Sequence, residues 1–243
     1  TVIVVMPSDH LIRDADAFQN AIRTAAGSVR KSGIAVIGVQ PTGPATGYGY
    51  IKPGAAAKDG TSAVARFVEK PDAARAAELI TEGCLWNAGM FAFRAGWLIE
   101  AMQAVEPEAV DLVTASVAGM KEDLGMWVPG ASFGKVRSIS FDHGFMEKTE
   151  EARVAPGNFR WSDVGDWDAV WSVSERDAAG NAIRGDGFAF EAKDNLIHSE
   201  GRLVCAVGVE GLAIIETPDA IMVAPRGRAQ DVKGLVGALK SAG

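Results

Sequence analysis

Two short apolar runs enclose an amphipathic stretch at the start of the chain, and this order restricts the fold more than any other feature. Val2–Met6 holds five consecutive apolar residues, which is typical of a parallel strand buried on both faces. Residues 14–32 carry apolar side chains at helical spacing, and Gly33 stands where a C-terminal cap glycine belongs. Ile34–Val39 is a second apolar run. This strand–helix–strand order predicts a parallel pair of strands and an α/β fold.

The alternation of strands and helices continues up to about residue 175. Asp72 has the position of a helix N-cap, Gly83 would close that helix, and Pro107 would begin a later one. The pattern predicts strands at 50–53, 63–70 and 85–93, and helices at 73–82 and within 95–125.

The sequence changes in character near residue 175. Residues 175–187 are polar and glycine-rich, which predicts a loop. Three apolar runs follow at a spacing of about eight or nine residues, at 203–207, 212–216 and 220–224. Such spacing is typical of a small all-β module or of β-helix coils. We therefore expect one domain over 1–175 and a second over 176–243, which would end in a helix.

Composition excludes several classes of protein. The chain has 24 basic and 31 acidic residues, a net charge of −7 and no basic run, so nucleic acid is not an expected partner. Cys84 and Cys205 each lie in an apolar run and are predicted to be buried thiols in a reducing compartment. No apolar stretch approaches the ~20 residues of a membrane span, and no signal peptide is recognisable. These features predict a cytoplasmic protein without membrane contact.

Asp9 follows the first strand directly, within the segment PSDH. A carboxylate at this end of a strand could hold a divalent metal, or it could cap the next helix, and the residues alone favour neither. Glu69 and Lys70 place opposite charges at the end of a strand. Glu69 could accept hydrogen bonds from sugar hydroxyls and Lys70 could neutralise a phosphate, although an exposed ion pair is the commoner arrangement.

Asn87 and Gly89 interrupt an apolar strand. A polar ligand could satisfy the Asn87 amide, but a β-bulge satisfied by neighbouring backbone is the slightly favoured alternative. Asp163 lies in WSDVGDW (161–167) and could complete a metal site begun by Asp9. The alternative is that Ser162 or Asp163 caps the following helix, with Asp166 and Asp168 in its first turn.

Several catalytic signatures do not occur. The sequence has no Cys/His dyad, no histidine-rich cluster and no Gly-x-Gly-x-x-Gly. Nucleophilic catalysis by a cysteine and nicotinamide chemistry therefore have no support in the sequence.

The order of the motifs is more specific than any single one. PSDH, TGYGYI, FVEKPD, WNAGMF, DHGFMEK and WSDVGDW succeed one another along the chain. In this order they resemble the bacterial mannose-1-phosphate guanylyltransferases of the sugar-nucleotidyltransferase superfamily. The resemblance covers nearly the whole chain. It implies a Rossmann-like nucleotide-diphospho-sugar transferase fold with a small C-terminal left-handed β-helix module.

The resemblance also implies a reaction and a set of site residues. GTP and mannose 1-phosphate would give GDP-mannose and pyrophosphate, with Mg²⁺ as cofactor. Asp9 and Asp163 match the metal-binding carboxylates, and Lys70 matches the residue that meets the sugar phosphate. The matching substrate contacts are Gly49, Glu69, Lys70, Asn87, Gly89 and Asp142, with Lys148 as a further contact.

The sequence departs from the family pattern in three places. The glycine-rich segment Gly-x-Gly-x-Arg…Pro-Lys, which would hold the nucleotide, is not in the chain, so we expect a longer natural polypeptide. Relatives often have Asp-Tyr-Ala-Val-Met-Glu-Lys where this chain has DHGFMEK. Some relatives also continue into an isomerase domain.

Two other functions stay open. One is a non-catalytic regulatory subunit that binds a sugar nucleotide, and the other is a nucleotidyltransferase for another hexose 1-phosphate. The small β-module would pack on the larger domain or on a second subunit, so the resemblance allows a homo-oligomer.

Overall fold

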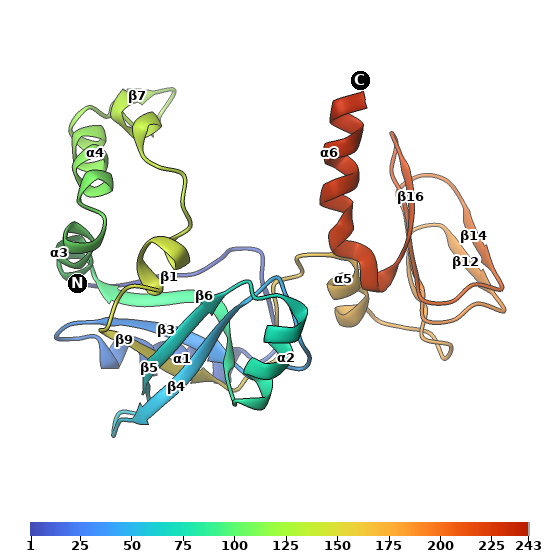
Figure 1. Cartoon of the computed structure of the whole chain (residues 1–243). Coiled ribbons are helices and arrows are strands. Elements are labelled where there is room, and N and C mark those ends of the chain that lie inside the picture. The colour runs from blue at the N-terminus through green and yellow to red at the C-terminus, as the bar shows by residue number, and fades with distance from the viewer. Residues whose placement is uncertain (243) are drawn as a thin grey trace. The chain divides into compact units, whose positions relative to one another are not determined.

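The computed structural model describes residues 1–242, which form two compact units (Figure 1). The first unit comprises residues 1–8 and 12–161, and the second comprises 9–11 and 162–242. No helix among the described residues is long and apolar enough to cross a membrane. The domain boundary near residue 175 stays a prediction.

A mixed sheet forms the centre of the first unit, with the strand order β1-β6-β3-β9-β5-β4 (Figure 1). β3 pairs in parallel with β9 and antiparallel with β6, so the predicted strand at 34–39 is confirmed. The strands are β1 (Val2–Val5), β3 (Ile34–Val39), β4 (Gly49–Ala56), β5 (Ser62–Glu69), β6 (Leu85–Arg94) and β9 (Ala152–Gly157).

The prediction of a fully buried parallel strand at the start of the chain is wrong. β1 stands at the edge of the sheet, pairs antiparallel with β6, and leaves Ile3 39% and Val5 47% exposed. β1 and β3 run in the same direction, but β6 lies between them. An apolar run shows that a strand is hydrophobic without showing which strands pair with it.

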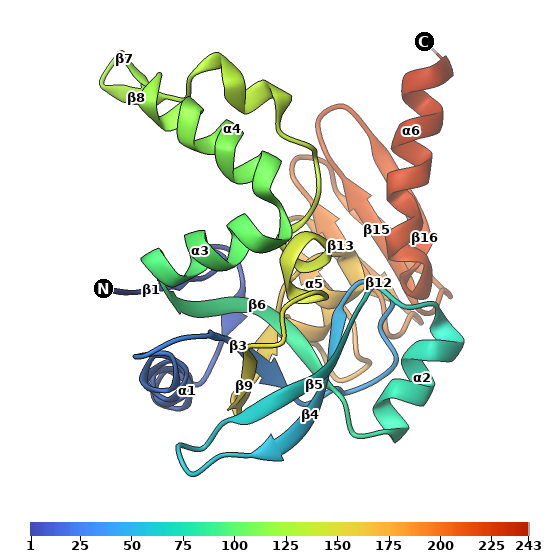
Figure 2. The same ribbon diagram turned by 60° about the vertical axis from the view of Figure 1, so that its left-hand side comes forward.

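Helices cover both faces of this sheet, and Figure 2 shows α1 and α3 on opposite sides. α1 (Ala15–Ser28) and α2 (Ala73–Thr81) pack on one face, whereas α3 (Ala95–Val105) and the π-helix η2 (Asp142–Met146) pack on the other. α4 (Pro107–Ala118) follows α3 and begins at the predicted proline. The remaining elements are the paired β7 (Lys121–Asp123) and β8 (Met126–Val128), and the 3-10 helix η1 (Ala131–Lys135).

Two helix ends test the predicted caps. Asp72 accepts a hydrogen bond from the Arg75 amide at 2.8 Å, which confirms it as the N-cap of α2. α1 ends at Ser28, so Gly33 does not cap it. Gly33 has φ +89°, and a Cβ there would lie 2.8 Å from the Glu151 carbonyl oxygen. The glycine therefore allows β3 to start beside the backbone of residue 151.

Parallel strands stack in the second unit and form β-helix-like coils. β11 (Ala182–Arg184), β13 (Leu196–Ser199) and β15 (Leu212–Glu216) pair in parallel, as do β12 (Gly187–Phe190) and β14 (Val204–Val207). β16 (Ile221–Pro225) runs antiparallel to β15. The unit also contains α5 (Trp167–Val173), the 3-10 helix η3 (Arg226–Asp231) and α6 (Val232–Ala242).

The predicted fold class is confirmed, but two local predictions for this unit are wrong. Residues 175–187 are not all loop, since β11 and the start of β12 lie there. These short strands gain their partners from the next coil, about 14 residues further on, and local sequence does not record that pairing. Cys205 is exposed on β14, whereas Cys84 is buried as predicted.

The short strands β2 (Leu11–Ile12) and β10 (Trp161–Ser162) pair where the chain passes between the two units.

Candidate functional site

A buried carboxylate stands at the end of β5. The Glu69 side chain is only 4% exposed, and its Oε2 atom has no hydrogen-bond partner among the residues that the structure describes. Glu69 pairs with Gly49 across the sheet, and a Cβ at position 49 would lie 2.5 Å from that oxygen. The exposed ion pair favoured from the residues alone is therefore wrong for Glu69.

Lys70, the residue after β5, has an unusual backbone conformation. Its φ is +47°, in the left-handed region that residues other than glycine rarely adopt. Its amide donates to the Tyr48 carbonyl at 3.2 Å, and its Nζ pairs with the Glu69 carboxylate. Regular alternation would point the two side chains to opposite faces. The positive φ instead brings them together, and we term residues 69 and 70 the β5 corner.

Asn87 joins two further predicted residues. Its Nδ2 donates to Asp142 Oδ1 at 2.9 Å, and its Oδ1 accepts from the Gly89 amide at 2.9 Å. The β3–β6 register shifts between Val36 and Gly38, so the predicted bulge is present. The bulge accounts for the amide oxygen, whereas the amide nitrogen contacts another predicted site residue.

Asp142 has a perturbed carboxyl group. Burial raises its pKa above the usual value, and the nearby charge of Glu69 raises the pKa further. The hydrogen bond from Asn87 acts in the opposite direction, because it stabilises the ionised form. Acids with a perturbed pKa are common in functional sites, so Asp142 supports a polar binding site here.

The sequence analysis missed two residues beside this cluster. Glu147 Oε1 accepts a hydrogen bond from the Glu69 amide at 3.3 Å, and its Oε2 lies 3.2 Å from His143 Nδ1. Their spacing of four residues within DHGFMEK is the signal that could have indicated the pair. Lys148 pairs with Glu106 instead of facing the Asn87–Asp142 contact.

Asp9 and Asp163 belong to the second unit. The pairing of β2 with β10 brings their two segments side by side. α1 begins only at Ala15, so the alternative that Asp9 caps it is wrong. Asp166 accepts from the Ala169 amide at 2.8 Å and is the N-cap of α5, so the alternative that Ser162 or Asp163 caps that helix is also wrong.

A tight turn holds the Asp163 carboxylate. Its Oδ1 accepts from the Gly165 amide at 3.1 Å, and a Cβ at Gly165 would lie 2.6 Å from Oδ2. Val164 between them has φ +50°, which is strained for a β-branched residue. Such strain is common at functional sites.

Both carboxylates offer the oxygen ligands that Mg²⁺ prefers, usually one or two from the protein. Within residues 1–242 there is no group of three or more His, Cys, Asp or Glu side chains that could hold a metal.

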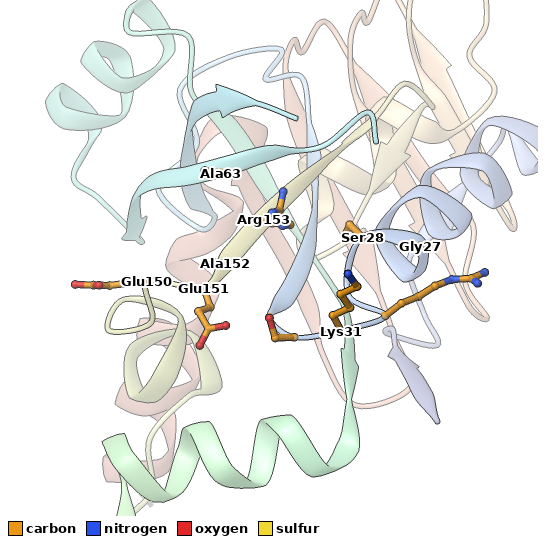
Figure 3. Close-up of a pocket in the computed structure, with 11 residues that line it drawn as sticks. Gly27, Ser28, Lys31, Ala63, Glu150, Glu151, Ala152 and Arg153 are labelled. Carbon is orange, nitrogen blue, oxygen red and sulfur yellow. The ribbon is translucent and has the colours of Figure 1, made fainter. Parts of the chain in front are cut away.

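A separate groove of about 600 Å³ lies in the first unit, where β3 and β9 begin (Figure 3). Lys31 and Arg153 line it together with Glu150 and Glu151. The Arg153 guanidinium donates to Thr61 Oγ1 at 3.4 Å. The groove contains none of the predicted site residues. The β5 corner lies at the opposite end of β5, so the two features are distinct.

A model described as nucleotidyl transferase matches residues 1–180. The chain belongs to the nucleotidyl transferase family. A second model, described as a mannose-phosphate isomerase/GMP-like β-helix domain, matches residues 185–239 of this nucleotidyl transferase.

Relatives and a solved structure agree with this assignment. The xanthan biosynthesis protein XanB of Xanthomonas campestris pv. campestris is 41% identical over 100% of this chain and 52% of its own length. A mannose-1-phosphate guanylyltransferase of Salmonella muenchen is 37% identical over 99% of this chain and 51% of its own length. The chain thus spans about half the length of these curated relatives.

The match to a solved structure covers a larger share of the other protein. The crystal structure of a mannose-1-phosphate geranyltransferase from Thermus thermophilus superposes with a TM-score of 0.86 at 31% identity. The match covers 98% of this chain and 70% of that one.

Proposed function

We propose that the protein containing this chain is a mannose-1-phosphate guanylyltransferase, which converts GTP and mannose 1-phosphate to GDP-mannose and pyrophosphate. An oxygen of the sugar phosphate would attack the α-phosphorus of GTP. The bond from that phosphorus to the oxygen bridging to the β-phosphate would break, and pyrophosphate would leave. The family assignment and the Salmonella relative support the proposal.

One observation carries the proposal for the first unit. Glu69 is a buried carboxylate whose Oε2 has no hydrogen-bond partner among the described residues, and Gly49 has no Cβ that would displace this oxygen. Burying such a group without a partner costs free energy, so a ligand that donates a hydrogen bond would recover it. A sugar hydroxyl is a donor of this kind.

The neighbouring residues complement a sugar phosphate. Lys70 is 58% exposed and would offer its ammonium to the phosphate. Asp142 and Asn87 would bind further hydroxyls. The missing side chain at Gly89 would allow the sugar to approach the backbone closely, and Gly49 leaves room for the Glu69 carboxylate beside it.

Asp9 and Asp163 would hold Mg²⁺, as their oxygen donors and the held carboxylate of Asp163 suggest. When bound, the ion would reduce the repulsion between two anionic reactants. The residues of the chain would position those reactants, since phosphoryl transfer depends mainly on positioning and charge neutralisation. The cytoplasmic location and a homo-oligomer stay predictions.

The test uses the natural polypeptide. Its intact mass is measured first, and pyrophosphate release is then followed with GTP, mannose 1-phosphate and Mg²⁺. Turnover by a polypeptide of any mass supports the proposal, and a mass well above 25.5 kDa would add that this chain is part of a longer enzyme.

Two results would overturn it. Turnover with a different hexose 1-phosphate, but not with mannose 1-phosphate, would make the protein a nucleotidyltransferase of other specificity. Binding of a sugar nucleotide without any turnover would favour a regulatory subunit.

A further inference from the structure

The β5 corner has an unfavourable backbone conformation. Lys70 has a positive φ and precedes Pro71, and a residue before proline favours an extended conformation. Conformations of this kind persist only where surrounding contacts hold them. One contact is the hydrogen bond from the Lys70 amide to the Tyr48 carbonyl. The other comes from outside the sheet and is the bond from the Glu69 amide to Glu147.

The π-helix η2 explains why Glu147 reaches the corner. The Glu147 amide donates to the Asp142 carbonyl at 3.0 Å, a step of five residues. Residues 142 and 147 are therefore stacked on successive turns, where an α-helix would stack 142 with 146. Asp142 contacts Asn87, and Glu147 contacts the Glu69 amide. The π-helix thus directs two acids of one segment toward the same cluster.

The segment that carries Glu147 is held firmly. Phe145 and Met146 are buried in the core on this face of the sheet. Lys148 and Arg137 both pair with Glu106, at 2.5 and 2.8 Å. Both charge partners lower the pKa of Glu106, and Lys148 has the larger effect. Glu147 therefore extends from a segment that core packing and ion pairs hold in place.

Both carboxylate oxygens of Glu147 face protein groups, Oε1 the Glu69 amide and Oε2 the His143 ring. We infer that Glu147 is a positioning residue that holds the β5 corner in its ligand-binding conformation, and that His143 in turn holds Glu147. The inference rests on the proposed function of the corner as the sugar-phosphate site.

The test compares Glu147→Ala, Glu147→Gln and the control Glu150→Ala in the natural polypeptide. Glu150 is an exposed acid three residues away. The first readout is hydrogen exchange of the Glu69 amide, and the second is the KM for mannose 1-phosphate beside the KM for GTP and kcat. Glu147→Ala should speed exchange about tenfold, because the amide loses its acceptor. It should also raise the KM for mannose 1-phosphate about tenfold and leave the KM for GTP unchanged.

Glu147→Gln keeps an oxygen that can accept the same bond, so it should restore both readouts, and Glu150→Ala should behave as the wild type. Should Glu147→Ala fail to fold, His143→Gln provides the same test with Glu147 in place, with a change of about threefold in each readout. Unchanged exchange in Glu147→Ala, or equal damage in Glu147→Gln, would overturn the inference.

The two proposals fail in different ways. Fast exchange in Glu147→Ala, in a protein that does not use mannose 1-phosphate, would support the positioning contact and reject the proposed function. Normal exchange with a raised KM would reject positioning and leave the function standing.

Discussion

Two glutamates are buried to a similar extent but differ in the hydrogen bonds that their carboxylates make. Glu216 in the second unit is 2% exposed, and its Oε2 accepts from the amides of residues 200, 201 and 202 and from the Ser199 hydroxyl. Glu69 in the first unit is almost as buried, but its Oε2 has no partner among the described residues. Native structures rarely leave buried polar atoms unpaired. A buried carboxylate with every bond made stabilises a fold, whereas one with a bond left open is available to a ligand.

The same contrast recurs three residues apart in WSDVGDW. Asp166 caps α5 through the Ala169 amide. Asp163 is held in a strained turn that fixes its carboxylate. Four predictions test whether each acid serves the fold or, as proposed, binds a ligand.

The largest effect is expected at Asp163. Asp163→Asn should reduce turnover about 1000-fold, because a weaker ligand for the metal loses several kcal/mol of charge stabilisation. The matched variant Asp166→Ala should destabilise the fold by about 1 kcal/mol and leave kcat unchanged. Pyrophosphate release and thermal unfolding measure the two effects. Unfolding of Asp163→Asn would show that this carboxylate serves the fold after all.

Glu69→Gln should lower kcat/KM for mannose 1-phosphate about 10- to 100-fold, since hydrogen bonds to charged groups contribute about 1.5–3 kcal/mol. Its melting temperature should hardly change, because Oε2 makes no bond within the described residues and the Lys70 side chain that pairs with the carboxylate is 58% exposed. Kinetics and differential scanning calorimetry on the same sample provide the check. A large fall in melting temperature with normal kinetics would show that Glu69, like Glu216, stabilises the fold and does not bind the substrate.

Asn87 shares features of both groups of residues. Its amide makes hydrogen bonds within the protein, as expected for a structural residue, but one of them is to the candidate site residue Asp142. Asn87→Ala should weaken sugar preference about tenfold and leave GTP binding intact. It should also raise the pKa of Asp142 further, because the hydrogen bond that favours the ionised carboxyl is lost. Competition between mannose 1-phosphate and glucose 1-phosphate, with an NMR titration of Asp142, tests both points. Unchanged sugar kinetics would leave Asn87 as a bulge residue only.

The smallest effect on turnover is expected at Glu216. A substitution there should alter stability and leave turnover unchanged. Hydrogen bonds from backbone amides, above all that of Gly201, hold its pKa below the ordinary value of 4.5. The ionised group therefore adds stability that is fully present above the unfolded-state pKa and is lost as the pH falls through the folded-state pKa. Glu216→Gln should lower the melting temperature at neutral pH and differ less from the wild type in acid. An equal difference at every pH would show that charge has no part in it.

The order of the motifs predicts the candidate site residues, but it does not predict their local arrangement. Asp9, Glu69, Lys70, Asn87 and Asp163 were each identified with a structural alternative beside the functional role. The structure removes the capping alternatives for both aspartates and the exposed pair for Glu69. It also adds Glu147, which accepts a hydrogen bond from the Glu69 amide 78 residues earlier in the chain, and His143, which contacts Glu147.

The sequence by itself determined the α/β class, the strand at 34–39, the Asp72 cap and the family, because these depend on local periodicity and on motif order. Only the tertiary structure decided that β1 lies at an edge, that β11 pairs into a coil, and that Lys70 turns back toward Glu69. Each of these features depends on hydrogen bonds between segments distant in sequence. Periodicity reports which face of a strand is apolar, whereas pairing and long-range contacts decide what that face meets.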